Sequence, residues 1–125
     1  MEKIIFDTYA WIEYFNGSEK GMKVEQYFSK EVFTPNVVLL ELSCKLAKQN
    51  IKLQKYLDFI KINSRILQLN ENIIKETGKT YVEIRKKAKD FSMIDSVILT
   101  SARIIGAKVI TGDKHFEGLK EAIML

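Results

Sequence analysis

The fold class follows from the stretch Ile4-Ile5-Phe6-Asp7-Thr8, in which an apolar run ends in an acid. Its β-branched and aromatic residues favour a short buried strand over residues 3–7. An amphipathic helix is expected over residues 9–16, ending near Gly17. A strand that leads directly into a helix is the unit from which α/β folds with mostly parallel sheets are built.

Short apolar runs and amphipathic helices alternate along the rest of the chain. Further strands are predicted over residues 32–34, 65–69, 108–111 and, at an edge of the sheet, 122–125. Further helices are predicted over residues 20–30, 36–49, 52–61, 70–89 and 93–105, with residues 112–116 as a loop. Asn36 and Asn70 are expected to cap their helices. We therefore expect one domain over residues 1–125: an α/β fold, doubly wound, with a mostly parallel four- to five-stranded sheet and helices on both faces.

The composition is that of an ordinary globular protein. Of 125 residues, 46% are apolar and 29% charged, and no apolar run approaches the roughly 18 residues that a membrane span needs. A single cysteine, Cys44, excludes an internal disulfide and is predicted to be a small buried hydrophobe. With no signal-peptide layout at the N-terminus, a cytoplasmic protein without membrane contact is expected.

Four carboxylates end or interrupt the most apolar stretches. Asp7 and Asp113 follow predicted strands, whereas Glu41 and Asp95 lie in the first turns of predicted helices. Burying an unpaired carboxylate costs on the order of several kcal/mol, and ligands of open α/β sheets bind beyond the carboxyl ends of the strands. A shared divalent cation would satisfy all four groups, and oxygen ligands alone favour Mg²⁺ or Mn²⁺.

Each carboxylate also has a purely structural explanation, and these alternatives stay open. Asp7 fits a helix N-cap, and Asp95 fits the acid of an S-x-x-D capping box. Asp113 lies in a Gly-Asp turn, and Glu41 has Lys45 one helical turn away as a partner for a surface ion pair.

The distribution of charge suits a polyanionic partner. The net charge is +4, and once the four carboxylates are set aside, 12 of the 16 acidic residues remain against 20 basic ones. Arg85, Lys86 and Lys87 are candidates for contacts with a nucleic-acid backbone, although a solvated helix end is the favoured explanation of this run. The only histidine, His115, has no cysteine or second histidine with which to hold zinc and is interpreted as incidental.

At these residues the chain resembles the PIN-domain family, and most closely the compact VapC-type toxin ribonucleases of toxin–antitoxin pairs. The matching segments, in the family's order, are Ile4–Thr8, Val37–Leu42, Met93–Arg103 and Ala107–Phe116. One departure is bulky: Tyr9-Ala10-Trp11 follows Thr8, where small or aliphatic residues are also common, so the substrate preference is expected to differ in detail.

The resemblance implies a single PIN-like domain with metal-dependent endoribonuclease activity. One or two Mg²⁺ or Mn²⁺ ions would be held by the catalytic acids Asp7, Glu41, Asp95 and Asp113, with Thr111 and Thr8 in support. Asp7 and Asp95 are expected as direct ligands, and Glu41 as the group that orients the attacking water. The resemblance further implies an RNA substrate, a cognate antitoxin protein and a homodimer. For such a substrate, Arg85, Lys86 and Lys87 are our candidates for holding the RNA backbone.

Two alternatives belong to other functional classes. A catalytically silent PIN-fold binding module shares the fold but has no need of the intact acidic set. A receiver-like phosphoacceptor domain shares the length and the doubly wound sheet. It needs an aspartate after the third strand, where this chain has Gln68-Leu69-Asn70.

Overall fold

A central sheet of five strands organises the protein, seen in a computed structural model that describes all of residues 1–125. The strands are β1 (Lys3–Phe6), β2 (Glu31–Pro35), β3 (Arg65–Leu67), β4 (Lys108–Thr111) and β5 (Ala122–Met124). Their order across the sheet is β3-β2-β1-β4-β5, and every neighbouring pair is parallel. The chain therefore steps outward from β1 to β3 and then crosses back to β4, so the winding direction reverses between β1 and β4.

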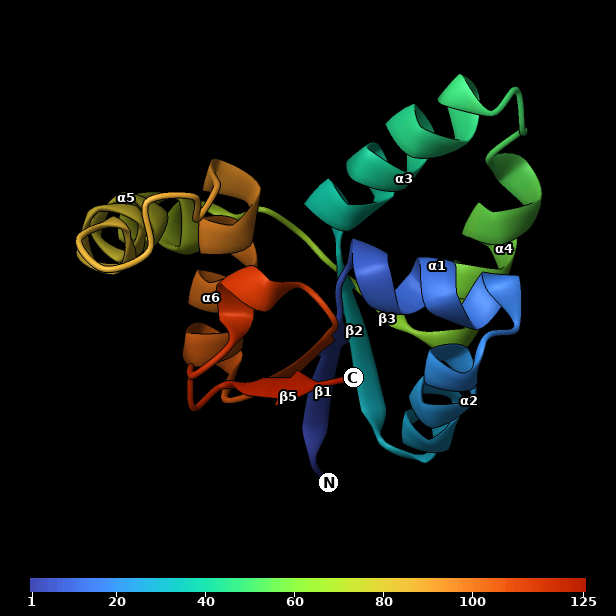
Figure 1. Cartoon of the computed structure of the whole chain (residues 1–125), viewed down its shortest axis with the longest axis horizontal. Helices are drawn as coiled ribbons and strands as arrows, with labels where there is room; N and C mark the ends of the chain where they lie inside the picture. The colour runs from blue at the N-terminus through green and yellow to red at the C-terminus, as the bar shows by residue number, and fades with distance from the viewer.

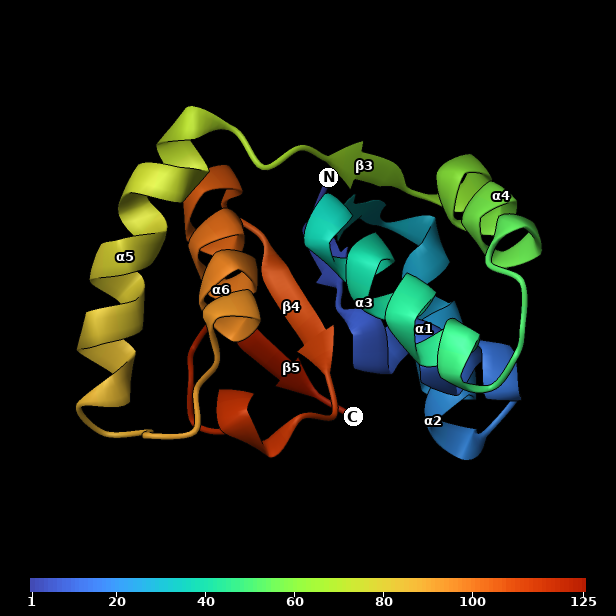
Figure 2. The same ribbon diagram turned by 90° about the horizontal axis from the view of Figure 1, so that it is seen from above.

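Helices cover both faces of this sheet. They are α1 (Thr8–Asn16), α2 (Glu19–Glu25), α3 (Asn36–Lys48), α4 (Gln54–Asn63), α5 (Glu71–Arg85) and α6 (Met93–Ile105), with 3-10 turns η1 (Gln26–Ser29) and η2 (Lys114–Phe116). Helices α1 to α4 lie on one face, and α5 and α6 pack together on the other (Figures 1 and 2). The predicted doubly wound α/β fold is confirmed. The receiver-like alternative is wrong, because that fold has the strand order 2-1-3-4-5.

Two apolar groups hold the layers together. On the α1 side, Trp11 is fully buried, packs edge-on against Phe6 at 5.1 Å between ring centroids, and donates from Nε1 to the Thr34 hydroxyl at 3.1 Å. On the α6 side, the buried rings of Phe91 and Phe116 lie 5.3 Å apart. This second pair ties η2 to the segment that leads into α6.

Local sequence signals place most helix ends. Gly17 and Gly106 end α1 and α6 in the left-handed conformation, with φ of 67° and 72°. Asn70 caps α5 by accepting from the Ile73 N–H at 2.9 Å, as predicted. Ser92 and Asp95 form the predicted capping box at the start of α6. None of the helices combines the length and the apolar character needed to cross a bilayer.

Several predictions of local structure were wrong. Asn36 is the first residue of α3 and does not cap it, since Pro35 takes the cap position and the Asn36 amide donates to Gln68. The helix expected over residues 20–30 divides into α2 and η1. Cys44 is exposed, because the buried side of α3 is formed by Val37, Val38 and Leu42.

The remaining differences are shifts of element boundaries. Helix α5 ends at Arg85, not Lys89, and the strand expected over residues 65–69 ends at Leu67. The predicted loop over residues 112–116 contains the 3-10 turn η2, and the strand predicted at the edge of the sheet is confirmed as β5.

Candidate active site

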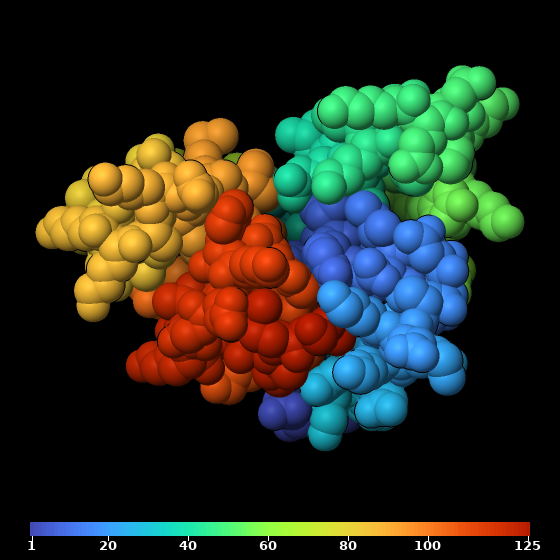
Figure 3. All heavy atoms as spheres, viewed as in Figure 1, coloured from blue at the N-terminus to red at the C-terminus, as the bar shows by residue number.

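Two of the four carboxylates leave the sheet at the point where its winding reverses. Asp7 directly follows β1, and Asp113 lies two residues beyond β4. These strands pair in parallel with Phe6 beside Ile110, so both acids emerge at the same edge. Because the carboxyl ends of strands at a switch point border the ligand-binding crevice of open α/β sheets, this edge is the place to expect a site. Figure 3 shows the surface hollowed between α6, in orange, and α3, in green.

The turn after β4 brings three ligating groups together. His115 Nδ1 lies 3.2 Å from Asp95 Oδ2 and 3.3 Å from Asp113 Oδ1, and each of these residues offers one ligand atom within 4.8 Å of the other two. Asp95 also accepts from the Ser92 N–H at 3.0 Å through its capping box. Asp95 therefore does form the predicted capping box, and the same carboxylate oxygen, Oδ2, also contacts His115.

Asp7 is the most deeply buried of the acids. It caps α1 by accepting from the Ala10 N–H at 2.8 Å. Burial raises its pKa from 3.8 to about 7; hydrogen bonds from the Thr111 hydroxyl and the Ala10 N–H oppose the rise, and the charges of Asp113 and Asp95 add to it. Asp7 therefore lies close enough to Asp95 and Asp113 for their negative charges to raise its pKa, and its burial also disfavours the ionised carboxylate.

Glu41, on α3, lies outside the cluster of Asp95, Asp113 and His115 and reaches the end of β1 through Thr8. Its Oε1 accepts a hydrogen bond of 2.6 Å from the hydroxyl of Thr8, the residue after Asp7. The surface ion pair between Glu41 and Lys45 does not form, because Glu41 turns toward α1 instead. Thr8 thus links the fourth acid to the end of β1.

The predicted supporting and basic residues take varied positions. The Thr111 hydroxyl accepts from the Asp113 N–H at 2.9 Å and so fixes the turn that carries this acid. Arg85 donates to the Phe91 carbonyl at 2.8 Å, which commits its guanidinium to the loop before α6. Lys86 and Lys87 are exposed, and Lys87 shares a surface hollow with His115.

The comparisons with known proteins agree with this fold. The sequence matches the PIN domain family over residues 4–122. The chain belongs to the PIN domain family. A search of curated protein sequences finds no significant match to this PIN domain.

Solved structures share the fold of this PIN domain over nearly its whole length. A DNA-bound VapBC from Salmonella typhimurium has a TM-score of 0.76 at 21% identity, covering 100% of this chain and 98% of that one. A toxin–antitoxin complex from Klebsiella pneumoniae has a TM-score of 0.76 at 17% identity, covering 97% and 96%. VapC20 from Mycobacterium tuberculosis, described as a toxin that cleaves the sarcin–ricin loop, has a TM-score of 0.73 at 18% identity, covering 94% and 95%. At these identities the likeness establishes the fold.

The acidic residues of this PIN domain fit a divalent cation. No Lys or Arg lies within ion-pair distance of Asp7, Glu41, Asp95 or Asp113. The only cationic partner in reach is His115, and its charge depends on protonation. Carboxylates that converge without fixed positive charge are a suitable donor set for Mg²⁺ or Mn²⁺.

His115 is the site residue that sequence reasoning missed. It was interpreted as incidental because one histidine cannot build a zinc site, yet its ring contacts both Asp95 and Asp113. The available signal was its spacing: His115 follows Asp113 by two residues in a short turn, and the turn is closed by its own N–H donating to Asp113 Oδ1 at 2.9 Å.

Proposed function

We propose that this PIN domain is a divalent-metal-dependent endoribonuclease that serves as the toxin of a VapBC-type toxin–antitoxin pair. The observation that carries the proposal is the convergence of Asp7, Asp95 and Asp113 at the β1–β4 switch point without a neutralising Lys or Arg. Family membership and the toxin structures that share the fold support it.

Each acid has a distinct task in the proposed reaction. Asp95 and Asp113 would hold a Mg²⁺ or Mn²⁺ ion, with Asp7 beside them at the end of β1. When bound, the ion supplies Lewis-acid stabilisation of the scissile phosphate and activation of water. Glu41, oriented by the Thr8 hydroxyl, positions the attacking water for in-line attack on phosphorus.

The basic groups near the site hold the RNA backbone. Lys86 and Lys87 are exposed just beyond the end of α5, and Lys87 lines the same hollow as His115, whose ring contacts Asp95 and Asp113. Arg85 contributes indirectly by fixing the loop before α6.

Cleavage of total RNA by the purified protein tests this proposal. Wild-type protein with Mg²⁺ or Mn²⁺ is expected to cleave, EDTA to abolish cleavage, and Asp95→Asn to lower the rate by at least about 100-fold. Asp90→Asn, which changes an exposed acid outside the cluster, is the matched control and is expected to cleave normally. Cleavage that survives EDTA or Asp95→Asn would exclude the proposed mechanism.

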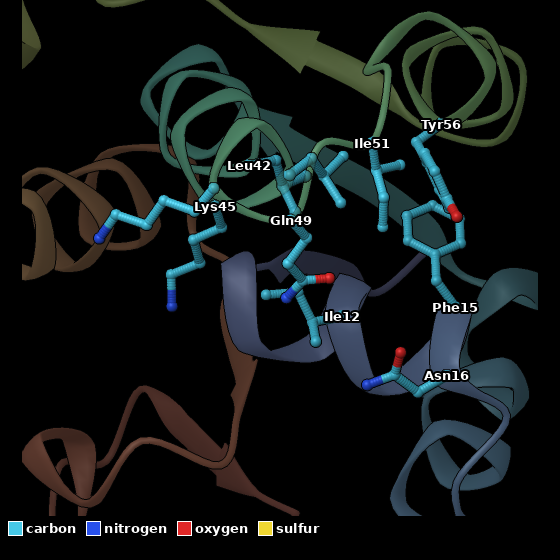
Figure 4. Close-up of a pocket in the computed structure, with 10 residues that line it drawn as sticks. Ile12, Phe15, Asn16, Leu42, Lys45, Gln49, Ile51 and Tyr56 are labelled. Atoms are coloured by element: carbon cyan, nitrogen blue, oxygen red, sulfur yellow. The ribbon is translucent and has the colours of Figure 1, made fainter.

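A groove between α1 and α3 is the proposed surface for the antitoxin. Figure 4 shows Ile12 of α1 beneath Leu42 of α3, while Phe15 of α1 points toward Tyr56, with Ile51 beside them. The cavity measures about 320 Å³, and Lys45 and Lys48 also line it. Apolar anchors flanked by carboxylates would complement such a groove.

The α5–α6 face is the proposed homodimer surface. Ile74 and Met93 are 57% and 66% exposed and line an apolar hollow of about 430 Å³ with Tyr81 and Val97. Exposed apolar patches of this kind mark association surfaces. Light scattering is expected to give a dimer for the wild type and a monomer for Ile74→Glu. Ile104→Glu, on another face of α6, is expected to leave the dimer intact.

A further inference from the structure

The imidazole of His115 contacts both Asp95 and Asp113, so it could serve as a third ligand of a cation bound by these two aspartates. We propose that His115 Nδ1 coordinates the divalent ion together with Asp95 and Asp113, and that the site therefore takes a first-row transition-metal ion such as Mn²⁺ in preference to Mg²⁺. This inference rests on the proposed function, because it concerns the ion of the same site.

The distances at the cluster are those of neighbouring ligands on one ion. Nδ1 lies 3.2 Å from Asp95 Oδ2 and 3.3 Å from Asp113 Oδ1. Two donor atoms about 2.1 Å from one ion and at right angles to each other are roughly 3.0 Å apart. The ring nitrogen therefore needs little movement to share an ion with both carboxylates.

The turn that carries His115 is held from two directions. Its backbone N–H donates to Asp113 Oδ1 at 2.9 Å. The next residue, Phe116, is 1% exposed and packs on Phe91 just before α6, the helix that bears Asp95. These contacts fix the backbone at His115 relative to both aspartates, and the ring itself is oriented by its contacts with Asp95 and Asp113, as a metal ligand requires. In the contact with the aspartates Nδ1 carries the proton that the carboxylates accept; an ion bound at Nδ1 would replace this proton, and Nε2 would then carry the ring proton.

The chemistry of nitrogen sets the preference among ions. Mg²⁺ is a hard ion that selects oxygen donors and retains much of its water, whereas an imidazole ligand favours first-row transition-metal ions, more strongly Fe²⁺, Ni²⁺ and Zn²⁺ than Mn²⁺. A site of two carboxylates and one imidazole is therefore expected to discriminate against Mg²⁺. An all-oxygen site made by the four acids alone would not discriminate in this way.

Pulsed EPR of Mn²⁺ added to the tag-free protein tests the inference directly. His115 is the only histidine of the chain, so modulation from a directly coordinated imidazole ¹⁴N has one possible source. The wild type is expected to show this modulation, and His115→Gln to lack it. By calorimetry, His115→Gln is expected to lower the Mn²⁺ affinity on the order of 10-fold and to leave the Mg²⁺ affinity within about 3-fold. Lys114→Gln, the exposed neighbour, is the control and is expected to bind like the wild type.

The possible failures are distinguishable. Mn²⁺ that binds to the wild type without ¹⁴N modulation would overturn the role of His115 and leave the nuclease proposal standing. Equal losses of Mn²⁺ and Mg²⁺ affinity in His115→Gln would overturn the preference. A wild type that binds neither ion and does not cleave RNA would remove the proposed function together with this inference.

Discussion

The Thr8 hydroxyl donates a hydrogen bond of 2.6 Å to Glu41 Oε1, which joins the first residue of α1 to the middle of α3. The two residues are 33 positions apart, and the contact spans two helices on the same face of the sheet. Hydrogen bonds to charged groups are shorter and stronger than neutral ones, so this contact aims the Glu41 carboxylate at the end of β1.

Replacing Thr8 by Val is expected to impair cleavage more than stability. The substitution keeps the shape of the side chain and removes the donor to Glu41. A hydrogen bond to a charged group contributes about 1.5–3 kcal/mol, so the cleavage rate is expected to fall at least about 10-fold. Stability is expected to fall by about 1 kcal/mol, since Glu41 is only half-buried and regains water.

RNA cleavage rates and urea unfolding measure the two effects. Thr8→Ser keeps the hydroxyl and is expected to restore most of the activity. Equal rates for Thr8→Val and the wild type would mean that Glu41 needs no positioning by Thr8.

Asp7→Asn is expected to stabilise the metal-free protein at neutral pH while it abolishes cleavage. Burial raises the Asp7 pKa from 3.8 to about 7, so between these values the folded state binds a proton that the unfolded state has released. The contribution of Asp7 to the free energy of unfolding is therefore most favourable below about pH 4 and is lost as the pH rises to about 7. Asn keeps the cap on α1 without the charge, so it removes this loss, which is on the order of 4 kcal/mol at most.

Urea unfolding in EDTA from pH 5 to 8 measures this effect. The gain from Asp7→Asn is expected to grow with pH and to shrink when Mn²⁺ is added to both proteins, because the ion stabilises the ionised acid. Asp58→Asn, which changes an exposed acid of α4, is the control and is expected to show no such trend. An Asp7→Asn variant no more stable than the wild type at pH 8 would contradict the buried charge.

The positions of the site acids on the strands were predictable from sequence, whereas the contacts of their side chains were not. Asp7 and Asp113 were placed correctly because each follows an apolar run that predicts a strand. The carboxyl ends of parallel strands lie at the same edge of the sheet. The direction of Glu41 depends on how α3 packs against α1, which periodicity does not describe. The sequence therefore offered only the helical neighbour Lys45 as a structural partner of Glu41, and Thr8 was expected to support the site without this contact.

The same limit explains the errors at His115 and Cys44. The sequence analysis asked only whether one histidine could complete a zinc site. It could not show that the His115 N–H donates to Asp113 and so closes the turn. Cys44 lies in an apolar segment, yet only one side of α3 faces the sheet, and the residue is on the other side. Composition identifies an apolar helix without settling which of its positions are covered.

Gly112→Ala is expected to disturb the site through Tyr9. A Cβ at position 112 would fall inside the van der Waals radius of the Tyr9 ring. Either the ring moves, with loss of its hydrogen bond from Lys20 at 3.0 Å, or the turn before Asp113 moves. We expect a loss of about 1–3 kcal/mol in stability and a slower cleavage rate.

A double-mutant cycle with Tyr9→Ala identifies the cause. The double variant is expected to be more stable than the sum of the single effects predicts, because the truncated ring leaves room for the new methyl group. Gly78→Ala is the control: it lies within α5, no atom lies within 4 Å of the added Cβ, and it is expected to stabilise by about 1 kcal/mol. Additive effects of Gly112→Ala and Tyr9→Ala would assign the damage to another contact.

Ile51→Glu is expected to weaken antitoxin binding without affecting RNA cleavage. Ile51 is 38% exposed and lines the groove between α1 and α3, so a carboxylate there removes an apolar contact and repels acidic groups of the partner. The affinity for the cognate antitoxin is expected to fall on the order of 10-fold or more by calorimetry. Ile62→Glu changes an apolar residue of α4 that is 83% exposed and outside the groove, and it is expected to bind normally. Because neither residue contacts the acidic cluster, both variants should cleave RNA at the wild-type rate. Equal antitoxin affinity for Ile51→Glu and Ile62→Glu would place the partner on a different surface, the exposed α5–α6 face being the next to test.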